Sequence, residues 1–204
     1  MIVKTESQAA YSELFDTTRH FARVLFGIKL DVAVGCLDHS SPIMNGFKEA
    51  WPDIRLITCW PHTERNCRNH QKDKLRDAQY FEAVILPHIQ WLHKSRSLDQ
   101  FTALIDQCTQ TWIEDGEEEY ASWFTSTYAD EDWGTWYYGS GAGICGVLPS
   151  QNPIESFHKA IKTSGIPTKR APTSVYFNKT TERLLVKYAR DLLKDEPHTA
   201  VKKG

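Results

Sequence analysis

The chain has 204 residues, of which 41% are hydrophobic and 25% charged, and its formal net charge is −2. This composition is typical of a globular protein with a sizeable core, and it excludes nucleic-acid binding through a global basic field. No apolar run reaches the roughly 18–20 residues of a membrane helix, and the polar N-terminus lacks a signal-peptide core. Five cysteines at irregular spacing indicate reduced thiols in an intracellular protein.

The first sixty or so residues predict a βαβ unit. Apolar residues recur at helical spacing over residues 5–27, which predicts an amphipathic helix. Residues 30–37 form an apolar run of strand length that stops at Asp38. A helix is expected at 41–51, with a proline in its first turn, and a second strand at 54–60. Strand, helix and strand within about thirty residues predict two parallel neighbours in one sheet.

Helical periodicity dominates residues 63–130, which we expect to form an inserted all-helical subdomain. Helices are expected at 80–93, 98–112 and 117–128, with breaks near Pro87, at 95–97 and at 115–116. The acidic run at 117–119 favours a solvated helix start.

A segment rich in glycine and aromatic residues follows. Its aromatic side chains could stack on unpaired bases, but their density favours a place in the core; they are Trp133, Trp136, Tyr137 and Tyr138. Gly139-x-Gly141-x-Gly143 follows no clear strand and is interpreted as a flexible turn. Helices are then expected at 153–162 and 174–194, before a loose tail at 196–204.

Two carboxylates are candidates for a metal site. Asp38 stands at the carboxyl end of a predicted strand, where open α/β sheets usually bind ligands. Glu155, on a helix that could cross the same edge, would complete a site for divalent cations. Two such metals clamp the attacking and leaving oxygens of a phosphodiester displacement, and Mg²⁺ needs few protein ligands. Either carboxylate alone is a common feature of ordinary helices and strands.

Three ordered motifs give these carboxylates a context. They are Leu37-Asp38-His39-Ser40-Ser41-Pro42-Ile43-Met44-Asn45-Gly46-Phe47, Cys59-Trp60-Pro61-His62-Thr63-Glu64-Arg65-Asn66 and Asn152-Pro153-Ile154-Glu155-Ser156-Phe157-His158-Lys159-Ala160-Ile161-Lys162. Together with Ala50-Trp51-Pro52, they resemble Mutator-like element transposases, over roughly residues 5 to 165. The resemblance implies a ribonuclease H-like fold and metal-dependent strand cleavage and transfer at transposon ends. It also implies Mg²⁺ or Mn²⁺ as cofactor, DNA as partner, a nuclear location and a possible homo-oligomer.

Within the resemblance, Asp38 and Glu155 correspond to the second and third acids of the family's Asp, Asp, Glu triad, and Cys59 with His62 to its Cys-x-x-His pair. The family's first Asp lies on a strand upstream of the helix that opens this chain. We therefore expect a truncated ribonuclease H-like core that is inactive alone and predominantly helical overall. Its parts would be a partial core at 1–62, the helical insertion at 63–130, the segment with the Glu-bearing and C-terminal helices at 131–195, and the tail at 196–204.

Two other readings stay open. The chain could be a non-catalytic DNA- or protein-binding module derived from a transposase. It could also be a helical interaction domain stabilised by zinc, because two Cys-x-x-His pairs follow each other and Cys2His2 is a zinc ligand set; the four residues are Cys59, His62, Cys67 and His70. The alternative to zinc is that Cys59 and His62 pack and hydrogen-bond near the site while Cys67 and His70 are incidental.

Residues around and after Glu155 are candidates for DNA contacts. His158 lies three residues after Glu155, hence on the same helix face, and could position a phosphate or a metal-bound water. A cluster of basic residues behind Glu155 could contact phosphates; its members are Lys159, Lys162, Lys169 and Arg170. The alternative for all of them is an ordinary solvated helix surface.

Overall fold

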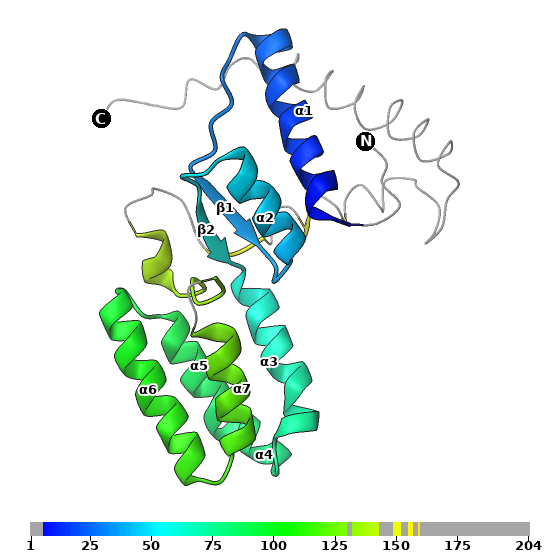
Figure 1. Cartoon of the computed structure of the whole chain (residues 1–204). Helices are drawn as coiled ribbons and strands as arrows, with labels where there is room; N and C mark the ends of the chain where they lie inside the picture. Colours follow the sequence, from blue (N-terminus) through cyan, green and yellow to red (C-terminus); the bar gives the residue numbers. More distant parts are fainter. Residues whose placement is uncertain (1–5, 130–131, 143–148, 152–154, 157–158, 160–204) are drawn as a thin grey trace. The chain divides into compact units, whose positions relative to one another are not determined.

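The computed structural model describes residues 6–129, 132–142, 149–151, 155–156 and 159 (Figure 1). The chain divides into two units, residues 1–151 and 152–204. The first unit contains α1 (Gln8–Phe26), β1 (Val34–Leu37), α2 (Ser41–Ala50), β2 (Arg55–Thr58), α3 (Trp60–Lys74), α4 (Ala78–Tyr80), a π-helical turn η1 (Phe81–Ile85), α5 (Leu86–His93), α6 (Leu98–Glu114), α7 (Glu118–Tyr128) and a 3-10 turn η2 (Tyr138–Gly141). No helix in these described ranges has the length and apolarity to cross a membrane.

The βαβ unit predicted from the sequence is confirmed. β1 and β2 pair in parallel, from Val34 opposite Arg55 to Leu37 opposite Thr58. Both strands are shorter than predicted, since only Val34–Leu37 and Arg55–Thr58 pair with each other. β2 starts only after a turn closed by the Ile54 N–H on the Trp51 carbonyl (3.0 Å), and it stops because Trp60 already begins α3.

α1 ends as predicted and packs mainly on α2. Ser7 caps its first turn by accepting a hydrogen bond from the Ala10 N–H, and Gly27 closes its last turn at φ +68°, a left-handed conformation that glycine adopts without strain. The Phe15 ring stacks on Phe47 at 4.4 Å between centroids. The helices approach closely at Gly46, where a Cβ atom would lie 2.8 Å from the Cβ of Tyr11.

The expected helical region forms a bundle of α3, α5, α6 and α7, which lie side by side in Figure 1. Its core is largely aromatic, and its largest fully buried side chains are Trp112, Trp136, Tyr120, Tyr128, Phe81 and Phe124. The prediction that the aromatic segment after α7 joins the core is confirmed for Trp136 and Tyr137. It is wrong for Tyr138, whose side chain is exposed while one ring edge meets His93.

Two local predictions are corrected by the structure. The helix does not break near Pro87; it continues from η1 into α5, and the Leu86 N–H bonds to the Phe81 carbonyl. The wider π turn just before Pro87 gives the proline ring room that an α turn denies. Glu117 is not a solvated residue at a helix start. It is buried and accepts hydrogen bonds from the backbone N–H groups of Arg76 (2.9 Å) and Asp77 (3.2 Å).

Candidate functional site

A pocket of about 240 Å³ lies at the carboxyl ends of the two strands. One wall follows β1, the other belongs to the first turns of α3, and the lining residues are Asp38, His39, Ser40, His62, Arg65, Asn66 and Asn69. All seven are polar or charged. The two walls meet because the carboxyl ends of parallel strands lie at the same edge of a sheet. The residues that follow β1 and β2 therefore lie at that edge.

Asp38 is half-buried at the point where β1 ends. No residue in the described part of the chain donates a hydrogen bond to its carboxylate or forms an ion pair with it. The pKa of Tyr11 on α1 is raised by burial, by the charge of Glu6 and, to a smaller extent, by the charge of Asp38. Asp38 thus lines the pocket as a carboxylate to which no described residue donates a hydrogen bond.

Cys59 and His62 hold the start of α3 at the same edge. The Cys59 Sγ lies 3.1 Å from His62 Nδ1 and accepts a hydrogen bond from the Gln151 N–H at 3.2 Å. The neighbouring Cys36 thiol stabilises the Cys59 thiolate, with smaller contributions from His62 and the Gln151 N–H. These interactions lower the pKa of Cys59 to about 5 against the opposing effect of burial. The interaction with Cys59, together with burial, raises the pKa of Cys36.

The structure does not bring the four proposed zinc ligands together. Cys67 is fully buried in the helical core, and His70 bonds to the Asn66 carbonyl and stacks on Trp123 at 4.2 Å. Eight helical residues at about 1.5 Å each place Cys67 roughly 12 Å along the axis from Cys59, whereas zinc binds thiolates at about 2.3 Å. Among residues 6–129, 132–142 and the other described positions, no group of three His, Cys, Asp or Glu side chains could hold a metal ion.

The second predicted carboxylate belongs to the other unit. Glu155 and Lys159 are exposed helical residues there. The remaining predicted DNA contacts lie outside the described residues; they are His158, Lys162, Lys169 and Arg170. Most of the helices expected at 153–162 and 174–194 lies outside them as well.

The sequence-based prediction missed His39 and Ser40 on the β1 side of the pocket, and it missed three residues on the α3 side, Arg65, Asn66 and Asn69. A signal for these last three was present: counted from His62 they follow at positions i+3, i+4 and i+7, which is one face of a helix. Asn66 is also held in place from the bundle, since its Nδ2 donates to the Tyr128 hydroxyl at 2.6 Å.

Chemically, the pocket offers a carboxylate for a cation, a guanidinium for an anion, and side-chain amides that can donate or accept. Comparison with protein-family models and with curated proteins finds no match to this chain. The resemblance to Mutator-like transposases therefore rests on the three sequence motifs, two of which supply every residue of this pocket apart from Asn69.

Proposed function

We propose that the pocket at Asp38 is part of a metal-dependent DNA-processing site of the Mutator-like transposase type, carried on a ribonuclease H-like fold. The observation that carries the proposal is the state of the Asp38 carboxylate. It is partly withdrawn from water at a strand end, and the described residues give it no hydrogen-bond donor. Such a carboxylate costs free energy unless a cation compensates it, and a divalent cation is the partner that this position in a parallel sheet favours.

Mg²⁺ or Mn²⁺ suits the pocket, because a hard cation binds through one or two carboxylates and fills its remaining positions with water and substrate phosphate oxygens. When bound, it activates the attacking water or 3′-hydroxyl and stabilises the leaving oxygen. Asp38 would hold the metal. Glu155 is the proposed second carboxylate, supported by the Asn-x-x-Glu motif. The parallel βαβ unit with a helical region after it supports the ribonuclease H-like assignment, and DNA as partner and a nuclear location are proposed from the same resemblance.

A non-catalytic DNA-binding module is the second candidate. It is favoured by the single carboxylate in the pocket and by the polar face of α3 opposite it. The two candidates differ in one consequence. A catalytic site needs Asp38 for cleavage, whereas a binding module retains DNA whether or not Asp38 is present.

The first prediction concerns nicking of supercoiled plasmid DNA, an assay that registers a single cut per molecule and so detects slow enzymes. If this chain nicks DNA without a counterpart of the family's first Asp, the activity should require Mg²⁺ or Mn²⁺. It should fall at least about 100-fold in Asp38→Asn, which keeps the side-chain volume but removes the charge that holds the metal. Glu155→Gln should reduce it similarly. Asp53→Asn is the matched control, since Asp53 is an exposed turn residue outside the pocket.

Nicking that survives in Asp38→Asn at the rate of Asp53→Asn would overturn the catalytic proposal. Retention of DNA without any nicking, equal in all four proteins, would favour the binding module.

A further inference from the structure

The wall of the pocket opposite Asp38 is a polar stripe on α3. His62, Arg65, Asn66 and Asn69 lie on one helix face, and all four line the pocket. The first turn of α3 carries no acidic residue, so no side chain of that turn offsets the partial positive charge of the helix N-terminus.

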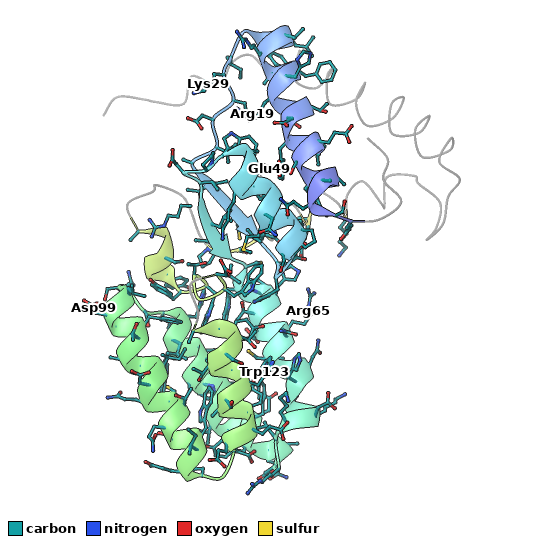
Figure 2. The ribbon with its side chains drawn as sticks, in the orientation of Figure 1. Arg19, Lys29, Glu49, Arg65, Asp99 and Trp123 are labelled. Atoms are coloured by element: carbon teal, nitrogen blue, oxygen red, sulfur yellow. The ribbon has the colours of Figure 1, made fainter. Side chains whose placement is uncertain are left out.

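Arg65 is exposed and carries the positive charge of the stripe, and no described residue, Asp38 included, forms an ion pair with it. Figure 2 shows its side chain extending outward from α3. Arg68, three residues on, behaves differently, because Glu64 at 3.2 Å and Glu82 both neutralise it. Asn69 is exposed as well and makes no side-chain hydrogen bond within the described ranges.

We propose that Arg65, with Asn69, binds a phosphodiester group of the DNA backbone beside Asp38. A guanidinium presents a planar fork of N–H donors that matches two phosphate oxygens, and the Asn69 amide one helical turn away can donate to the same or the next phosphate. The Asn66 amide, which lies between Arg65 and Asn69 on this helix face, donates to the Tyr128 hydroxyl and so holds the wall in place. The choice of DNA among phosphate-bearing ligands rests on the proposed function.

The pocket recognises the backbone rather than the bases. The described residues of its lining include no Trp, Tyr or Phe on which a base could stack, and stacking platforms are the usual means of holding unpaired bases. Contacts to phosphates position a strand without reading its sequence. Arg65 therefore sets where the strand lies relative to Asp38, and its contribution is independent of base sequence.

The test is the affinity of the full chain for a short labelled DNA duplex, measured by fluorescence anisotropy in the presence of a chelator. Arg65→Gln should weaken binding about ten-fold and lower the slope of log K against log salt concentration by about 0.9, the value for one lost phosphate contact. Asn69→Ala should weaken it further in the double variant. Arg96→Gln, an exposed arginine outside the pocket, is the matched control.

Two outcomes would overturn the inference: no binding of DNA by the unaltered chain at low salt, or the same affinity and salt slope for Arg65→Gln and Arg96→Gln. Inorganic phosphate at constant ionic strength provides a third outcome. If it displaces the duplex at a concentration equal to that of the DNA phosphate groups, the pocket is a site for the free anion and the inference is overturned.

The binding result does not depend on whether the proposed catalysis is correct, because the chelator removes the divalent cations that catalysis needs. Asp38→Asn should bind DNA at least as tightly as the unaltered chain, since a negative charge next to the phosphate is removed. Absence of nicking together with a weakened Arg65→Gln would leave the phosphate site standing without catalysis. Nicking that depends on Asp38, together with an unaltered Arg65→Gln, would remove the phosphate site alone.

Discussion

Replacement of Trp136 by alanine is expected to lower the free energy of unfolding by about 3–5 kcal/mol. The indole is fully buried. It stacks on Trp60 at 5.7 Å and meets the edge of Phe101 at 5.1 Å, so it connects the first turn of α3 with α6. Its Nε1 donates to the Tyr128 carbonyl at 3.1 Å. The substitution removes the packing and leaves that buried acceptor without its donor.

Urea unfolding followed by circular dichroism measures the effect. The matched control is Trp91→Ala, because Trp91 is 55% exposed on α5, and its loss should cost less than about 1 kcal/mol. Equal midpoints for the two variants would contradict the described position of Trp136 in the core.

Gly139→Ala should also destabilise the chain, by about 1–3 kcal/mol or more. A Cβ at this position would lie 2.5 Å from the carbonyl carbon and oxygen of Arg96 and 2.8 Å from the Ser97 nitrogen. These are backbone atoms, which cannot rotate away as a side chain can. The approach is fixed by the hydrogen bond from the Gly139 N–H to the Ser95 carbonyl at 2.8 Å, so η2 would have to leave the loop between α5 and α6.

The comparison for Gly139 is Gly35→Ala in β1. There the nearest atom is the Cδ2 of Leu56 at 3.0 Å, the end of a flexible side chain. Thermal unfolding should therefore show a clearly larger loss for Gly139→Ala. If Gly35→Ala proved the more harmful of the two, the close contact between η2 and Arg96 would be refuted.

Much of the fold could be read from the sequence, because its signals are local. The spacing of apolar residues predicted α1, α6 and α7. The proline in its first turn indicated the start of α2, and Gly27 indicated the end of α1. The carboxylate at the strand end likewise followed from a local pattern, the apolar run that stops at Asp38.

The features that escaped prediction depend on partners far away in the chain. Glu117 is buried because it caps backbone N–H groups about forty residues earlier. The low pKa of Cys59 comes first from Cys36 on the neighbouring strand, and the Gln151 N–H, 92 residues later, contributes to it. Composition and periodicity do not reveal contacts between residues so far apart in the sequence. Arg65 is an intermediate case, because its helix face was predictable but the pocket that makes this face useful was not.

Paramagnetic broadening of backbone amide signals on titration with Mn²⁺ shows whether Asp38 binds a divalent cation. The signals of His39, Ser40 and Asn66 should broaden first, while that of Gly116, at the turn between α6 and α7, should stay sharp. In Asp38→Asn this selectivity should disappear. Pocket signals that remain sharp in the unaltered chain, or that broaden equally in Asp38→Asn, would show that Asp38 does not bind the cation.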